Sequence, residues 1–454
     1  MNIREAGAAI RRREMSCVEL LERCLDRVDR LNPDLNAFIT VSADSARARA
    51  AERDQELADG IDRGPLHGIP IAHKDLVCTR GQRCTSGSKL FEDYYPDYDA
   101  TVAARLDDAG AVCIGKTGLH ELAYGITSNN PHFGAIRNPH DRERIPGGSS
   151  GGSGVAVATG MALMATGTDT GGSIRIPASF CGVVGLKPTY GRVSRYGVKP
   201  LGLSLDHIGP LTRTVRDAAI ALYAMAGYDD RDPSCSRQPN LEYIPPTPCS
   251  MAEVRIGIPQ NYFFDGVDPQ VKAAVEHAAR LSETLGARVK PVQVPDVDAL
   301  NTVARTILFA EASAVFEPHL AKRDKFGEDV LALLDQGLLL PATAYVNAQR
   351  LRRFFIQEWR LIFSGVDCLF TPTTPMPAPL IGQKLVELDG HAQDVRLAAT
   401  RFMRGINALG LPALSIPCGK TAEGLPFGLQ IVGRAFEEHL VLRVGAAIED
   451  ALGR

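Results

Sequence analysis

Residues 146–191 read PGGSSGGSGVAVATGMALMATGTDTGGSIRIPASFCGVVGLKPTYG. Serines stand in two glycine-rich turns, Gly147–Gly152 and Gly171–Ser173, which a weakly polar segment of helix or strand length separates. Such turns expose backbone N–H groups, and these are the donors that stabilise a developing oxyanion. A flexible Gly/Ser linker would not continue into the apolar run Val155–Ala158. The stretch therefore favours a folded site for acyl-transfer chemistry.

The composition is that of an ordinary soluble protein. Of the 454 residues, 45% are hydrophobic and 23% are charged. The formal net charge of −3 gives no electrostatic reason to expect a nucleic-acid or membrane partner. No secretory signal opens the chain, and no window of about 18 apolar residues predicts a membrane span. The 10 cysteines are scattered singly, which favours reduced thiols over disulfides or a metal site. We expect a cytoplasmic protein.

The order of predicted elements favours an α/β fold. Apolar spacing predicts that residues 1 to about 60 are helical. Buried strands are expected around Lys74 and at 111–114, 368–371, 413–417 and 428–432. Strands alternating with helices imply a single large domain, in which helices cover both faces of a central mixed, mostly parallel sheet. We expect an N-terminal helical arm over residues 1–60 and a main domain over 61–454, with a helical substrate-side wall at about 298–363.

Two motif matches are rejected on structural grounds. Residues 110–117, GAVCIGKT, match the Walker A phosphate loop. That loop needs its strand before the first glycine, whereas here the inner residues 111–114 are themselves the predicted strand. The zinc-protease pattern that begins at His120 lacks its second histidine, because Tyr124 stands in that place.

A third match stays open as an alternative. Residues 147–151, GGSSG, are a literal G-x-S-x-G, which would make Ser149 the nucleophile of an α/β-hydrolase. The acid and histidine would come from later candidates such as Asp206 with His207, or from His391 or His439. That nucleophile should follow a buried strand, and residues 141–146, DRERIP, are a poor strand.

Taken together, several motifs closely resemble the amidase signature family. They are Lys74 in its apolar strand, the GGSSGG turn, GTDTGGSIRIP (167–177), SFCG (179–182), GLKPT (185–189), KTGLHEL (116–122) and GLPFGLQ (424–430). The resemblance runs from about residue 20 to 440. It implies the amidase signature fold, and cleavage of a small-molecule carboxylic amide to an acid plus ammonia or an amine through an acyl-enzyme. No metal or cofactor is implied.

The resemblance also assigns roles to residues. It implies a triad of Ser173 as nucleophile, Ser149 as the bridging serine and Lys74 as base. The implied oxyanion donors are the backbone N–H groups of Thr170, Gly171, Gly172 and Ser173, the implied acyl-pocket residues are Tyr124 and Gly125, and a cis peptide bond is implied beside Ser149. A lysine acts as a base only when neutral, and the apolar surroundings of Lys74 would lower its pKa from about 10.4.

Charged residues nearby have plainer expected roles. Asp169 and Arg175 flank the nucleophile and are expected to form a buried structural ion pair. His120 is expected to be structural. The arginines at 350, 352 and 353 are expected on a solvated helix face.

The family includes a second kind of protein, the A subunit of glutamyl-tRNA amidotransferase, which releases ammonia from glutamine for a partner subunit. Residues 36–40 and 191–197 are shared with that subunit, whereas residues 119–125 look more like the stand-alone amidases. We expect a stand-alone amide hydrolase, with the partner-dependent subunit as the alternative. The identity of the amide stays open, as does a homodimer through the N-terminal helices.

Overall fold

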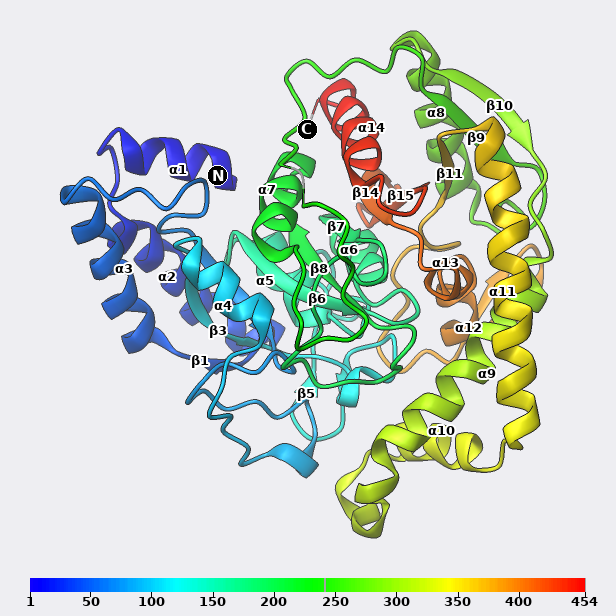
Figure 1. Cartoon of the computed structure of the whole chain (residues 1–454), viewed down its shortest axis with the longest axis horizontal. Helices are drawn as coiled ribbons and strands as arrows, with labels where there is room; N and C mark the ends of the chain where they lie inside the picture. The colour runs from blue at the N-terminus through cyan, green and yellow to red at the C-terminus, as the bar shows by residue number, and fades with distance from the viewer. Residues whose placement is uncertain (241, 454) are drawn as a thin grey trace.

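A central sheet of 11 strands organises the protein (Figure 1), in the order β1-β3-β2-β6-β8-β7-β14-β15-β11-β9-β10. The structure, a computed structural model, describes residues 1–240 and 242–453. The strands are β1 Phe38–Val41, β2 Pro70–Lys74, β3 Val112–Thr117, β4 Asn129–Asn130, β5 Gly134–Ala135, β6 Met164–Asp169, β7 Val184–Lys187, β8 His207–Thr212, β9 Arg255–Pro259, β10 Arg288–Val292, β11 Cys368–Pro372, β12 Leu385–Leu388, β13 His391–Asp394, β14 Ala413–Lys420 and β15 Pro426–Gly433.

The sheet is mixed, and its parallel pairs lie toward its two ends. Strands β3, β2 and β6 are mutually parallel neighbours, as are β11, β9 and β10. The strands between them pair antiparallel, and so does the edge strand β1 with β3. Strands β14 and β15 are joined by a short turn, and such a turn links only antiparallel neighbours. Every residue of β2, β6, β8 and β15 is buried, so helices cover both faces of the sheet.

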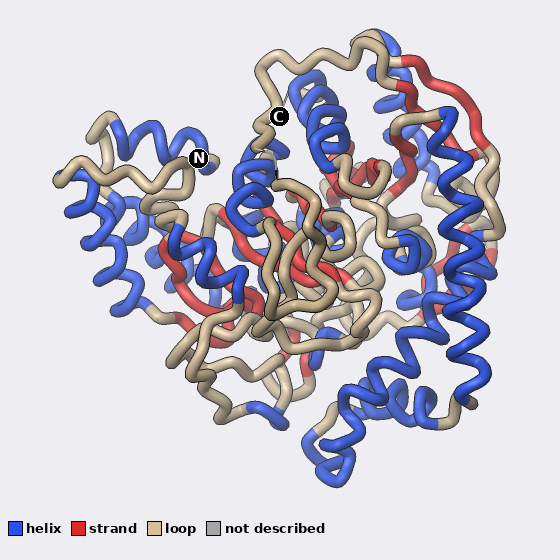
Figure 2. Tube along the Cα trace, viewed as in Figure 1, coloured by secondary structure: helices blue, strands red, loops and turns tan. Residues whose placement is uncertain are grey.

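Helices surround the sheet, which is interior in Figure 2. They are α1 Ile3–Arg11, α2 Cys17–Leu35, α3 Ala43–Ala58, α4 Thr101–Asp108, α5 Gly151–Thr159, α6 Arg175–Cys181, α7 Val215–Met225, α8 Pro269–Thr284, α9 Val297–Phe316, α10 Glu328–Leu338, α11 Ala342–Gly365, α12 Val395–Thr400, α13 Arg404–Leu409 and α14 Glu438–Ala451, with short 3-10 turns η1 Lys89–Phe91, η2 Glu121–Ala123 and η3 Glu317–Lys325. Local signals set their ends. Ser16 caps α2 in a capping box with Glu19, Thr214 caps α7, and Gly160 in the left-handed conformation ends α5.

The N-terminal region differs from the sequence-based expectation at one point. Residues 1–60 contain α1, α2 and α3, but Phe38–Val41 form strand β1 at the edge of the main sheet. The prediction of a wholly helical segment was therefore wrong there. The aromatic and β-branched residues of FITV suit a strand, and pairing with β3 gives them a partner that local sequence does not show.

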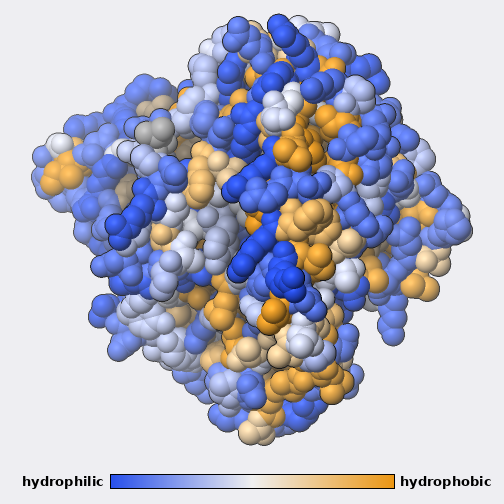
Figure 3. Space-filling view, turned by 45° about the vertical axis from the view of Figure 1, so that its right-hand side comes forward, coloured by the Kyte–Doolittle hydropathy of each residue, from blue (hydrophilic) through white to orange (hydrophobic). Residues whose placement is uncertain are grey.

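Helices α9, α10 and α11 form a helical region at one side of the molecule, at the lower right in Figure 1. Among the described residues no single helix is long and apolar enough to cross a membrane, and only α10 and α11 together, bent by 92°, pass that test. Figure 3 brings this side forward and shows hydrophobic side chains between hydrophilic ones. The exposed large apolar residues of α10 and α11 are Leu338, Val346, Leu351, Phe354 and Leu361.

Candidate active site

Lys74, Ser149 and Ser173 lie in three segments that the sheet brings together. Lys74 is the last residue of β2, Ser149 lies just before α5, and Ser173 lies between β6 and α6. Because β2 and β6 are parallel neighbours, their carboxyl ends meet at the same edge of the sheet. Ligand sites in open α/β sheets are found at this edge.

Lys74 is buried and bonded to one of the two serines. Its Nζ lies 2.7 Å from Ser149 Oγ and 2.8 Å from Thr168 Oγ1, and the residue has no exposed surface. Burial lowers the pKa of Lys74 to about 7, although the charges of Asp169 and Asp206 oppose that shift. Near neutral pH a large fraction of this amine is therefore unprotonated and able to accept a proton.

The two serines differ in access. Ser149 is fully buried and follows a cis Gly148–Ser149 peptide bond, as the family resemblance implied. Ser173 is 7% exposed, and its Oγ has no hydrogen bond within the described part of the chain. The Ser150 N–H donates to the Ser173 carbonyl at 3.3 Å, which joins the two turns. Ser173 is thus the more accessible of the two hydroxyls.

A buried ion pair holds the Ser173 turn. Arg175 donates to both carboxylate oxygens of Asp169, at 3.0 and 2.9 Å, and also to Gln430 and Asn407. Burial alone would raise the pKa of Asp169, but Arg175 outweighs it and the net pKa is lowered. The prediction of a structural ion pair is confirmed, since both side chains are fully buried.

The same carboxylate uses one of the predicted oxyanion donors. Asp169 Oδ1 accepts from the N–H of Gly172 at 2.8 Å, and Oδ2 accepts from Ile174 at 3.1 Å. The amides of Thr170, Gly171 and Ser173 have no partner among the described residues. Of the four implied donors, the N–H of Gly172 is therefore already hydrogen-bonded to a buried carboxylate, whereas the other three are not bonded within the described residues.

Breaking this ion pair is expected to destabilise the fold. In Arg175→Met the Asp169 carboxylate stays buried without its cation, so we expect the free energy of unfolding to fall by about 3–5 kcal/mol. Urea denaturation measures the change. Arg323→Gln removes an exposed ion pair with Asp335 and serves as the matched control, with no shift expected in the unfolding midpoint. Equal effects in the two variants would argue against a structural role for Arg175.

Tyr124, Gly125 and His120 lie together beside the site. Tyr124 is 5% exposed, and its hydroxyl is buried with no hydrogen-bond partner among the described residues. A Cβ on Gly125 would lie 2.1 Å from His120 Nε2, so packing against the imidazole requires glycine there. His120 bonds Asp329 and Thr127, which agrees with a structural histidine.

The pair Asp206 and His207, proposed for the α/β-hydrolase alternative, does not contact Ser149 by hydrogen bonds. Residues 136–148, which lead to Ser149, contain no strand. Asp206 accepts from Thr170 Oγ1, and His207 Nδ1 lies against the carbonyls of Leu205 and Asp169. Neither residue is hydrogen-bonded to Ser149, so this geometry does not form that triad.

Sequence reasoning missed two threonines that hold the lysine. Thr166 Oγ1 accepts from the Lys74 N–H at 3.1 Å, and Thr168 Oγ1 contacts Lys74 Nζ. Both stand on β6 two residues apart, so they face the same side of the sheet. Their alternation is a signal for shared orientation, but only the pairing of β6 with β2 shows which residue they face.

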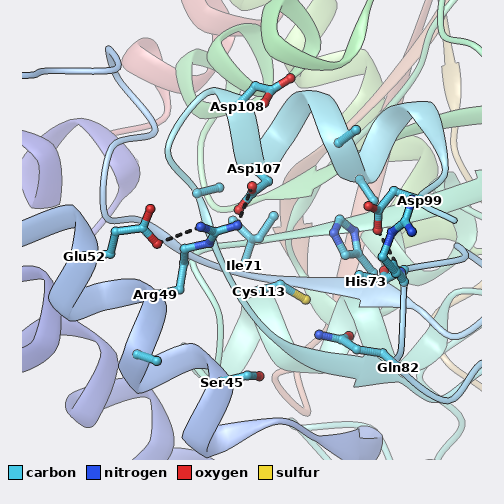
Figure 4. A pocket seen from close by; sticks show the side chains of 16 residues that line it. Ser45, Arg49, Glu52, Ile71, His73, Gln82, Asp99, Asp107, Asp108 and Cys113 are labelled. Carbon is cyan, nitrogen blue, oxygen red and sulfur yellow. Dashed lines mark hydrogen bonds and ion pairs between the residues drawn. The ribbon is translucent and has the colours of Figure 1, made fainter. Parts of the chain in front are cut away.

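Two cavities are lined in part by residues of β2 or β6. One of about 220 Å³ is lined by Thr168, Thr170, Ala123 and Lys199 among others, and so adjoins the site. Another of about 570 Å³ includes His73 and Cys113 (Figure 4). There Arg49 is paired with both Glu52 and Asp107. Because His73 and Lys74 are successive residues of a strand, their side chains point to opposite faces, and the larger cavity lies away from Lys74.

Metal-ligating groups do not cluster in the described ranges: no three His, Cys, Asp or Glu side chains there could hold one ion. All 10 cysteines are free thiols.

A buried lysine bonded to a serine lies at the edge of a helix-covered mixed sheet, and comparison with known proteins supplies the family. The chain belongs to the Amidase family, whose model matches residues 19–442. It is therefore an amide hydrolase of the amidase signature type, acting on carbon–nitrogen bonds.

The similar proteins include an amidotransferase subunit and two solved structures. The A subunit of the glutamyl-tRNA(Gln) amidotransferase of Carboxydothermus hydrogenoformans is 38% identical, over 99% of this chain and 96% of its own. A solved structure from a vestigial protein complex that reveals the evolutionary origins of an s-triazine catabolic enzyme has a TM-score of 0.95 at 36% identity, covering 99% and 98% of the two chains. An amidase crystal structure has a TM-score of 0.91 at 37% identity, covering 99% of each.

Proposed function

We propose that this chain hydrolyses a small-molecule carboxylic amide with Ser173 as nucleophile, Ser149 as proton relay and Lys74 as base. The observation that carries the proposal is the 2.7 Å hydrogen bond between the buried Lys74 amine and Ser149, beside the turn that holds the more accessible Ser173. A serine hydroxyl is a weak nucleophile until a base takes its proton. A lysine with a pKa of about 7 is such a base at neutral pH.

The proposed reaction forms an acyl-enzyme on Ser173 and then hydrolyses it. Ser173 Oγ attacks the amide carbonyl carbon while its proton passes to Ser149, whose own proton passes to Lys74. The backbone amides of Thr170, Gly171 and Ser173, free of other partners among the described residues, donate to the oxyanion. The relay returns a proton to the leaving nitrogen, and ammonia or an amine departs. Water then attacks the acyl-enzyme by the same relay and releases the acid.

A second candidate is the glutaminase-type A subunit of a tRNA-dependent amidotransferase. The identity of 38% to such subunits, over nearly the whole of both chains, favours it. Under this function the acyl group comes from glutamine and the ammonia passes to a partner subunit. Under the first function the chain works without such a partner, as a cytoplasmic enzyme.

The experiment that separates the two measures ammonia release by the purified chain. We expect release from at least one primary amide without a partner, and formation of a hydroxamate when hydroxylamine is added to capture the acyl-enzyme. Release from glutamine alone would favour the amidotransferase function. An absence of both ammonia and hydroxamate from every amide, glutamine included, would contradict the proposed hydrolase.

A further inference from the structure

Three arginines from separate helices lie within electrostatic range of Tyr124, and one of them packs against the Ser173 turn. They are Arg305 of α9, Arg396 of α12 and Arg404 of α13, and we call them the arginine cluster. All three are partly buried. Within the described residues none of their guanidinium groups makes a hydrogen bond or an ion pair, although Arg305 lies over the Phe309 ring, 5.7 Å from its centroid. Buried arginines are normally paired, as the fully buried Arg175 is, so three partly buried arginines without an ion pair need an explanation.

Arg404 packs directly against the nucleophile turn. A Cβ built on Gly171 would lie 3.4 Å from Cγ of Arg404. A Cβ built on Gly172 would lie 2.5 Å from Sδ of Met403, the residue before Arg404. Arg404 therefore borders the backbone that carries two of the proposed oxyanion donors. A group held by Arg404 would be part of the same bound molecule as the reacting amide.

Tyr124, from a different part of the chain, lies within electrostatic range of the same three arginines. The positive charges of Arg396, Arg404 and Arg305 all act on its hydroxyl, which is buried and has no partner among the described residues. A buried hydroxyl without a partner costs free energy, so the unpartnered Tyr124 hydroxyl points to a missing acceptor. Burial, followed by the charges of Arg305 and Arg396, lowers the pKa of Arg404 to about 9. The cluster is thus a concentration of positive charge whose guanidinium groups form no ion pair in the described part of the chain.

Two nearby carboxylates are engaged elsewhere. Asp329, the acid that interacts with Arg396, has its hydrogen bond to His120, and Asp169 is paired with Arg175. The exposed Asp298 acts on Tyr262 and Arg401, and its carboxylate forms no hydrogen bond or ion pair among the described residues. A bound anion would satisfy both the arginines and the Tyr124 hydroxyl, because guanidinium groups and phenols donate to carboxylate oxygens.

We propose that the substrate is an amide that also carries a carboxylate, held by Arg404, Arg305, Arg396 and the Tyr124 hydroxyl. The proposal rests on the proposed hydrolase and names its substrate class, the monoamides of dicarboxylic acids and their close analogues.

Matched substrates test the charge requirement. Succinamate and butyramide differ only in a carboxylate replaced by a methyl group, and malonamate and propionamide differ in the same way. Two charged interactions lost together correspond to at least about a 100-fold preference in kcat/KM for the carboxylated member.

Variants assign the effect to the cluster. Arg404→Gln is expected to lower kcat/KM for succinamate about 10- to 100-fold more than it lowers kcat/KM for butyramide, so that the preference between the two substrates falls by that factor. Arg305→Gln is expected to act in the same direction, and retained butyramide turnover shows that either variant has folded. Arg280→Gln, an exposed arginine of α8, is the control and should not change the ratio between the two substrates.

The outcomes separate this proposal from the function on which it rests. Equal hydrolysis of carboxylated and neutral amides would overturn the anionic substrate class and leave the hydrolase intact. Hydrolysis confined to glutamine among the carboxylated amides would overturn this substrate class and favour the amidotransferase function. No hydrolysis of any amide would contradict the proposed function itself.

Discussion

Ser173→Ala is expected to lower kcat for amide hydrolysis by at least about 10⁴-fold, because the covalent intermediate cannot form without the hydroxyl. The remaining rate would come from the oxyanion donors and substrate positioning, which the alanine leaves in place. Steady-state ammonia release, at enzyme concentrations high enough to detect the residual rate, measures the change. Hydroxamate formation should disappear together with turnover.

Two further serines complete that experiment. Ser149→Ala is expected to cause a smaller loss, since it removes the relay but keeps the nucleophile. Ser45→Ala, an exposed serine of α3, should leave kcat unchanged. If activity survives in Ser173→Ala and is abolished in Ser149→Ala, the nucleophile is Ser149 and the roles proposed for the two serines are reversed.

Lys74→Ala is expected to lower kcat/KM by about 10³-fold at pH 7 and to change the pH profile. In the wild-type enzyme activity should rise as the pH increases through about 7, because burial lowers the pKa of Lys74 to that value and only the unprotonated amine accepts a proton. The variant loses this inflection. Partial recovery is expected at alkaline pH, where hydroxide increasingly takes the serine proton.

Lys116→Met provides the matched control for that profile. Lys116 is also fully buried, on the neighbouring strand β3, but it donates to Val77 and Thr79 rather than to either site serine. Its replacement should retain the inflection near pH 7 even if stability falls. An equal loss in Lys74→Ala at every pH would count against the role of base and favour a positioning role for the ammonium.

The helices and many strands were predictable from local pattern. Thr214 caps α7 as its side-chain type predicts, and the strand inside residues 110–117 excludes a phosphate loop. Strand β1 was missed, because residues 38–41 lie between two strongly helical segments and become a strand only by pairing with β3. Arg352, expected on a solvated face, instead donates to Ala408 and Ser204 and links α11 to two distant segments.

The sequence by itself determined the chemistry that is available: two serines in glycine-rich turns, a lysine ending an apolar strand, and the motifs of the family. These features depend on neighbours within a few residues, whose conformational preferences act locally. Only the tertiary structure decided that Lys74 bonds Ser149, that Asp169 accepts a hydrogen bond from the Gly172 amide, and that the charges of three arginines act on the buried Tyr124 hydroxyl. Those contacts join residues as much as 280 positions apart, such as Tyr124 and Arg404, and they exist because the sheet and its covering helices bring separate segments to one edge.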